Sequence, residues 1–294
     1  MKYIRTYETE EKFLTDKDST SRGFRLKPTL YKYSEAGDHV QLELDDPRKH
    51  GDSTYMEITL DSDVEFSFYI GNAPDDTQTI RDCKVDWGDG DSGSTRLTSD
   101  DKGFKLSHNY KAGSYSIELY AIAGYSIIGD ATNYKSLISH PTSIKRVILG
   151  SGVVSIGKDA FRSCSSLTSV NIPESVTKIG GDAFSGCTGL TSVNIPESVT
   201  SISNVFRECS SLTSILIPER VTEILNYAFD GCTSLISISS LNTTAPTLGW
   251  SGSGQYTIFT GLPTNGTLHI KPGATGYDAW LYYLPEGWRI VEDL

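Results

Sequence analysis

The chain has 294 residues, of which 37% are hydrophobic and 21% are charged, and its formal net charge at pH 7 is −11. A general phosphate-backbone binder needs a basic surface, so this charge argues against nucleic acid as a partner. No apolar run reaches the roughly 20 residues of a membrane helix, which argues against membrane insertion. The N-terminal residues also lack the apolar core of a secretory signal, so the chain as written has no signal peptide.

Residues 1–53 are predicted to form a small ordered lead-in unit. Within it, ETEEKFLTDKD suits a short helix, whereas FRLKPTLYKY and HVQLELDD suit strands. The opening MKYIRTYETEEKF resembles the starts of proteins carried on phages and prophages of gut Bacteroides. That resemblance implies that the protein leaves the cell inside an assembled particle. The alternative is that a secretory signal peptide has been removed from the chain.

Residues 54–123 show the two-residue alternation of strands that bury one face, as in TYMEITL, VEFSFYI and YSIELYAI. The pattern predicts a small β-sandwich, with Trp87 in its core and a tight turn with positive φ at Asp89 and Gly90. VDWGDG followed by SHNYKAGSYSIELYA resembles the polycystic-kidney-disease (PKD) type of Ig-like domain. The resemblance implies a spacer or a binding accessory.

The aspartates after Trp87 raise the question of a metal site. Asp86, Asp89 and Asp91 offer oxygen ligands close together in sequence, which suits calcium. Their spacing does not match an EF-hand loop, and a plain turn with exposed carboxylates is the favoured interpretation. We expect no cofactor and no metal, with calcium at these residues as the less favoured alternative.

A repeat of 22 to 23 residues dominates the second half of the chain. Its units start near residues 144, 167, 190, 212 and 235, and LTSVNIPESVT occurs twice without change. Self-similarity at this period is typical of a leucine-rich-repeat solenoid, in which each coil buries its apolar slice against the next coil. The third unit has one residue fewer, SISNVF in place of KIGGDAF, and predicts a local irregularity.

These units resemble the BspA-type leucine-rich repeats of bacterial surface proteins, on the succession IPESVTKIGGDAFSGCTGLTSVNIPESVT. The resemblance implies a right-handed solenoid with a role in adhesion or recognition. The expected fold is therefore mainly β. Its expected parts are an Ig-like sandwich at 54–123, the repeats at 124–245 and an α/β cap at 246–294.

Four cysteines mark the same position of successive units: Cys164, Cys187, Cys209 and Cys232. A zinc site would use paired ligands such as CxxC, and the sequence contains no such pair. Neighbouring coils would bring successive Cα atoms within disulfide reach, yet parallel inward side chains favour a ladder of buried reduced thiols. The histidines are scattered and no nucleophile motif is present, so the chain is not expected to be an enzyme.

The outward strand positions predict a face of small polar side chains with a basic start, and three aromatic residues near the C-terminus predict a second candidate surface. Ile148 is also expected to point outward. The candidate binding face comprises Lys145, Arg146, Thr168, Asn171, Thr191, Asn194, Thr213 and Leu216. The candidate aromatic surface comprises Trp250, Tyr282 and Tyr283, although a cap over the last coil is the favoured role of this segment.

Two functions remain open at this stage. The first is a non-catalytic recognition or adhesion protein on the extracellular face of a bacterial cell or a virion, binding a protein or glycan of a host or neighbouring cell. The second is a structural spacer or assembly component that contacts virion components.

Overall fold

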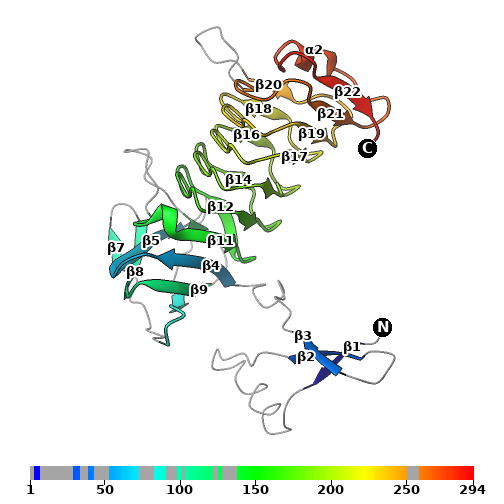
Figure 1. Ribbon diagram of the computed structural model, residues 1–294. Coiled ribbons are helices and arrows are strands. Elements are labelled where there is room, and N and C mark those ends of the chain that lie inside the picture. The colour runs from blue at the N-terminus through cyan, green and yellow to red at the C-terminus, as the bar shows by residue number, and fades with distance from the viewer. Residues whose placement is uncertain are drawn as a thin grey trace. The chain divides into compact units, whose positions relative to one another are not determined.

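The structure is a computed structural model that describes residues 3–6, 29–33, 39–42, 53–72, 83–90, 98–100, 103–121, 125–127, 138–249 and 258–294. The chain divides into two compact units, Met1–Lys49 and His50–Leu294. In the first unit, β1 (Tyr3–Thr6), β2 (Thr29–Tyr33) and β3 (His39–Leu42) form an antiparallel sheet in the order β1-β2-β3 (Figure 1). Two of these strands coincide with the expected ones. The expected helix lies outside the described residues.

The second unit begins with a section of seven strands, here called the N-terminal β-section. These strands are β4 (Ser53–Leu60), β5 (Val64–Asn72), β6 (Cys83–Asp86), β7 (Thr98–Asp100), β8 (Gly103–Tyr110), β9 (Gly113–Ala121) and β10 (Tyr125–Ile127). Residues of β4 alternate between buried and half-buried, as the sequence pattern predicted. In the turn after β6, positive φ was expected at Asp89 and Gly90, and the structure has it at Gly88 (77°) and Gly90 (91°) instead.

The repeats contribute two strands to most coils. On one side of the coils lie β11 (Ile144–Ile148), β13 (Ser169–Asn171), β15 (Ser192–Val193), β17 (Ser214–Ile217), β19 (Ser237–Ser240), β21 (Thr267–Ile270) and β22 (Arg289–Glu292). On the other side lie β12 (Val153–Ile156), β14 (Lys178–Ile179), β16 (Ser201–Ser203), β18 (Glu223–Leu225) and β20 (Thr247–Leu248). The only helical segments among the described residues are η2 (Pro141–Ser143) and α2 (Asp278–Leu281). The fold is therefore a mainly β solenoid.

The sheets of the N-terminal β-section run directly into the solenoid. β4 pairs antiparallel with β11, so that Met56 stands opposite Val147, and β10 pairs parallel with β12. The two resulting sheets have the orders β15-β13-β11-β4-β9-β6 and β14-β12-β10-β5-β8-β7. One hydrophobic core extends from Met56 to Trp288. The strands of the N-terminal β-section thus cover the first slice of the solenoid core.

One long sheet ends at β14 of the second coil, and the other ends at β15 of the third coil. The second strand of the third coil, β16, belongs to the sheet β16-β18-β20 of the following coils. The deleted residue precedes Asn204, which has a φ of 56°, and Asp182 has a φ of 59° at the matching position of the second coil. The irregularity expected in this shortened unit is present.

A column of aromatic rings runs through the coils. Phe161, Phe184, Phe206, Phe229 and Phe259 stack in succession, with ring centroids 5.3, 5.9, 6.0 and 6.2 Å apart. Trp280 of α2 closes the column, 5.7 Å from Phe259 and tilted by 44°. Its indole Nε1 donates to the carbonyl of Pro246, so that the buried ring keeps its polar group satisfied.

Candidate functional site

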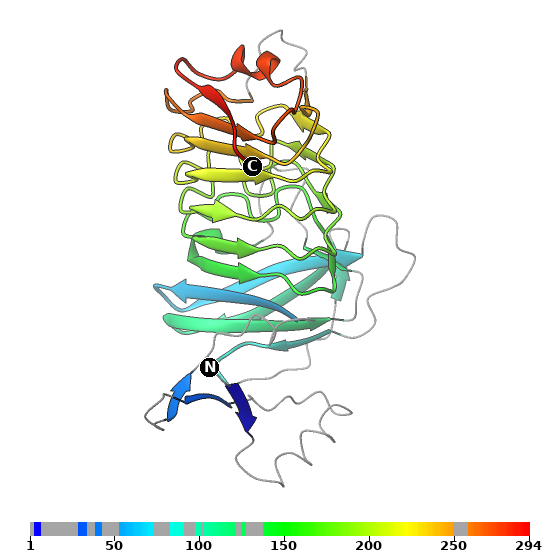
Figure 2. The ribbon, with the colours of Figure 1, turned by 90° about the vertical axis from the view of Figure 1, so that its right-hand side faces the viewer.

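Five strands lie on the same side of successive coils: β11, β13, β15, β17 and β19. The outward side chains of these strands and of the residues that flank them form one surface, here called the polar face, and Figure 2 shows its strands side by side. The register places Arg146 beside Ser169 and Ser169 beside Ser192, with side chains that alternate with buried valines. The exposed positions on this face are Lys145, Thr168, Asn171, Thr191, Ser192, Asn194, Thr213, Ser214, Leu216 and Ile236. All eight predicted binding-face residues lie on this surface, and Arg146 among them is half-buried.

Ile148 is the exception, and the prediction that it points into solvent is wrong. Its side chain is only 5% exposed, and its Cα pairs with Tyr55 of β4. The repeat pattern treats the first coil as the end of the sheet, whereas β4 continues the sheet past it. The small polar part of the face therefore begins at β13.

Two apolar side chains interrupt the polar face. Leu216 on β17 is 38% exposed, and Ile236, just before β19, is 53% exposed. Leu216 stands opposite Ser239, so the two apolar side chains lie on neighbouring strands about three residues apart along the strand direction, or about 10 Å. They are the apolar contacts that this face offers to a partner.

The predicted aromatic surface is present only in part. Tyr282 is 85% exposed and its ring lies 5.1 Å from that of Tyr283, in an edge-to-face arrangement. Trp250 lies outside the described residues. Trp280 and Trp288 are buried in the core and are not part of an exposed aromatic surface.

Two of the three aspartates of the alternative calcium site, Asp86 and Asp89, make contacts with other residues of the protein. Asp86 Oδ1 accepts a hydrogen bond from the Gly88 amide at 2.9 Å, and Asp89 Oδ2 lies 2.6 Å from His108 Nε2. The His108 ring stacks on Trp87 with centroids 5.1 Å apart. Asp91 lies outside the described residues. Among those that are described, no group of three or more His, Cys, Asp or Glu side chains could hold a metal ion.

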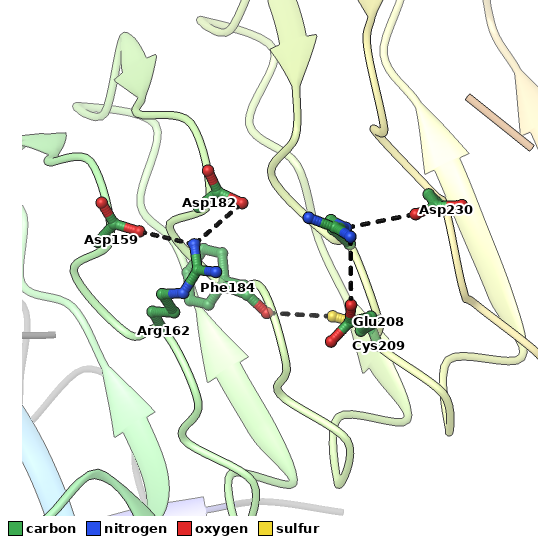
Figure 3. A network of polar contacts seen from close by, with 8 residues as sticks. Asp159, Arg162, Asp182, Phe184, Glu208, Cys209 and Asp230 are labelled. Carbon is green, nitrogen blue, oxygen red and sulfur yellow. Dashed lines mark hydrogen bonds and ion pairs between the residues drawn. The ribbon is translucent and has the colours of Figure 1, made fainter. Parts of the chain in front are cut away.

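The turns that follow β12 and β14 hold a buried ionic network that was not predicted. Arg162 Nη1 lies 3.0 Å from Asp159 Oδ1 and 3.3 Å from Asp182 Oδ1 of the next coil (Figure 3). Burial raises the pKa of the Asp159 carboxyl above its ordinary value, although Arg162 opposes this shift. The 23-residue spacing marks the two aspartates as equivalent positions of neighbouring coils, but it does not reveal their shared contact with Arg162.

A second arginine holds the later coils in a similar way. Arg207 Nε lies 3.3 Å from Asp230 Oδ2 of the following coil, and its guanidinium carbon lies 5.2 Å from the centre of the Tyr227 ring. Burial also raises the pKa of the Asp230 carboxyl. Both arginines therefore link neighbouring coils.

The cysteines form the expected ladder of buried free thiols, Cys164, Cys187, Cys209 and Cys232. The thiol of each of the last three donates to the carbonyl of a phenylalanine of the preceding coil, as Cys209 does to Phe184 at 3.2 Å (Figure 3). Burial raises the pKa of all four thiols, and that of Cys232 to about 12. The ladder thus has a structural role.

This ladder predicts that its four thiols hardly react with Ellman's reagent in the native protein. With a thiol pKa of about 12, only about one Cys232 thiol in ten thousand is ionised at pH 8. A Cys83→Ser variant keeps only the four cysteines of the ladder. In this variant we expect no thiol to react within an hour at pH 8 and four thiols to react in 6 M guanidinium chloride. Fast release from the native protein would contradict the buried ladder.

The comparisons with known proteins agree with the repeat architecture. The family model described as "BspA type Leucine rich repeat region" matches residues 135–247 in six copies. No curated protein matches the chain. Among the described residues, no helix is long and apolar enough to cross a membrane.

Several solved structures resemble this one. A leucine rich cell surface protein from Faecalibacterium prausnitzii has 29% identity and a TM-score of 0.40, and the match covers 55% of this chain and 39% of that chain. The pneumococcal vaccine antigen PcpA has 16% identity and a TM-score of 0.41, with 60% and 47% covered. A leucine-rich repeat protein from Bacteroides ovatus has 18% identity and a TM-score of 0.26, with 68% and 66% covered. The chain thus spans well under half of the F. prausnitzii protein.

Proposed function

We propose that this chain is a non-catalytic recognition protein of a bacterial cell surface or a virion, and that it binds a protein or glycan through the polar face. The observation that carries the proposal is the row of exposed hydroxyl and amide side chains on adjacent coils, with Leu216 and Ile236 among them. The match of the repeats to the BspA-type model supports the proposal, because repeats of this type are found in bacterial surface proteins.

The geometry of the polar face suits an extended ligand. Neighbouring strands lie about 4.8 Å apart, so hydroxyl and amide groups recur at that interval along the solenoid. Thr and Ser hydroxyls both donate and accept hydrogen bonds, as the hydroxyls of a glycan or the backbone of a peptide require. Each group lies on a strand or directly beside one, above a close-packed core, so the backbone that carries these groups is already ordered before a ligand binds.

The N-terminal β-section has a supporting part in this proposal. By its resemblance to PKD-type domains it serves as a spacer, and its direct pairing of β4 with β11 holds the polar face in a fixed orientation to that spacer. We assign the face, rather than Tyr282 and Tyr283, as the main site because the face carries many more exposed polar groups.

Binding to glycan arrays and to host-cell surface proteins tests the proposal. If the polar face is the site, replacing both Leu216 and Ile236 by aspartate should weaken the binding that is found by about tenfold or more, since it would place two unpaired charges in the buried interface. Thr188→Asp is a matched control, because Thr188 is exposed in a turn outside the face. It should leave affinity within about twofold.

Three outcomes would contradict the proposal. If the chain bound no glycan and no host protein on the arrays and co-purified with a virion or surface assembly, a structural spacer would be favoured. Binding that survives the double aspartate variant would exclude the polar face as the site. Loss of binding on Tyr282→Ala alone would instead place the site at the C-terminal end.

A further inference from the structure

In the part of the chain that the structure describes, the last strand of the solenoid, β22, is paired along one edge only. In the sheet order β17-β19-β21-β22 it pairs with β21 and with no other strand of the described chain. The amides of Arg289 and Asp293 donate to carbonyls of the β21 segment, at 3.2 Å each. Because peptide groups alternate in direction along a strand, those of Ile290 and Glu292 point away from β21. A row of backbone groups of this kind is a template for another strand.

Exposed apolar side chains gather at the same end of the molecule. The described part of the second unit has five large exposed hydrophobic residues, and three of them fall in the last fourteen positions. These are Leu281 (40% exposed), Tyr282 (85%) and Leu294 (44%). Figure 1 shows α2 and β22 together at the C-terminal end of the coil stack. A free edge beside an apolar surface is typical of an association site.

We propose that β22 pairs antiparallel with β22 of a second copy of this chain, which makes the C-terminal end a homodimer interface. In a two-fold symmetric antiparallel pair, opposite residues lie on the same face of the sheet. The register centred on Val291 satisfies this condition. It places Ile290 opposite the second copy's Glu292, and these are the two residues whose peptide groups point to the free edge.

Charge complementarity favours this register. Arg289 and Asp293 are both exposed, and both lie on the same side of the sheet as Val291. In the dimer Arg289 stands opposite the second copy's Asp293, and the symmetry repeats this pair at the other end of the strand. Asp293 also contacts His269 Nδ1 at 2.9 Å, which fixes its carboxylate on this side of the sheet.

The apolar end surface supplies the rest of the interface. A stable interface buries about 800 Å² on each partner, which is more than a four-residue strand provides. The two-fold axis through Val291 brings the same end surface of each copy face to face, so that Tyr282 and Leu281 add to the buried area. Because the contact is the same patch on both copies, association stops at the dimer.

Sedimentation velocity and light scattering of the full chain test the proposal. Between about 10 and 300 µM, a range that covers typical weak dimers, we expect a species of twice the 32.2 kDa monomer. Arg289→Asp should raise the dissociation constant by about tenfold, because two ion pairs become two repulsions. The double change Arg289→Asp with Asp293→Arg should restore most of the affinity. The control Arg220→Asp alters another exposed arginine, between β17 and β18, and should have no effect.

Cross-linking at the two-fold axis tests the register itself. Non-hydrogen-bonded antiparallel pairs have Cα atoms about 4.5 Å apart, within reach of a disulfide. In a Cys83→Ser background, Val291→Cys should form a covalent dimer on mild oxidation, whereas the control Thr191→Cys on the polar face should not. A monomer at all concentrations, filaments, a dimer unaffected by Arg289→Asp, or a dimer without a Val291→Cys cross-link would each overturn the proposal.

Discussion

Replacing Phe206 by alanine is expected to lower the free energy of unfolding by about 3–5 kcal/mol, the usual cost of emptying a fully buried aromatic site. Phe206 is completely buried, and its ring stacks between Phe184 at 5.9 Å and Phe229 at 6.0 Å. Its loss therefore opens a cavity with rings on both sides. Urea titration followed by circular dichroism and tryptophan fluorescence would measure the change.

The position of Phe206 adds a second expectation. One long sheet ends at β14 of the second coil and the other at β15 of the third, so continuity around the third coil depends on the core and on bonds in the turns, such as the amide of Phe184 to the carbonyl of Val205. Coils couple only to their neighbours, so weakening one junction lowers the cooperativity of the whole solenoid. We expect Phe206→Ala to separate the unfolding curves of the two probes, which should coincide in the wild type.

Two controls show whether this effect belongs to the ring and its position. Phe161→Ala empties the same column in the first coil, where β12 pairs with both β10 and β14, and it should keep a single transition. Thr213→Ala alters an exposed side chain and should change stability by no more than about 0.5 kcal/mol. A loss below about 1.5 kcal/mol for Phe206→Ala would contradict the tight stacking described above.

The sequence predicted the interior of the repeats well because one packing solution recurs in every coil. The period predicted one buried apolar slice in each coil, and Leu167, Val170, Ile179, Phe184 and Cys187 of the second coil are all buried. A residue that faces inward in one coil must face inward in the next, so a single periodic pattern determines many side-chain directions at once.

The joins between segments were not predictable in the same way. The pairing of β4 with β11 connects a strand of two-residue alternation to a strand of the repeat, and no shared period relates them. Consequently, the burial of Ile148 was missed. The unpaired edge of β22 was missed for a similar reason. The repeat period breaks after Pro246, so it does not predict the pairing of the last strand.

The contact between Arg162 and Asp182 was missed for a local reason. Asp159 and Asp182 both adopt positive φ, 57° and 59°, a conformation that turns their side chains away from the direction expected for a regular strand or turn. Spacing identifies equivalent positions in successive coils, but it does not say that an arginine three residues after one aspartate reaches the next.

Replacing Arg162 by leucine is expected to destabilise the protein by about 2–3 kcal/mol at pH 7. The Asp159 side chain is fully buried, and its Oδ2 atom has no hydrogen-bond partner among the described residues. Without the guanidinium, this carboxylate would keep the cost of burial and lose its counter-charge. Arg162 itself is partly exposed, which places the expected loss below that of a fully buried pair.

The loss should depend on pH in a defined direction. Because the pKa of Asp159 is raised in the folded state, the folded protein binds its proton more tightly than the unfolded chain does. Its contribution to stability is therefore fully present below the unfolded value of about 3.9 and is lost as the pH rises through the folded pKa. Removal of Arg162 raises that pKa further. Arg162→Leu should consequently cost more at pH 8 than at pH 5, as urea titrations at the two values would show.

The double variant Asp159→Asn with Arg162→Leu separates the buried charge from the packing of the arginine. Asn204 already occupies the matching position of the third coil with a φ of 56°, so asparagine fits this backbone. A neutral amide needs no counter-charge, and we expect the double variant to recover more than half of the stability lost by Arg162→Leu and to lose its pH dependence between 5 and 8. No recovery, or an equal loss at both pH values, would mean that Arg162 acts through the packing of its side chain rather than through the charge of Asp159.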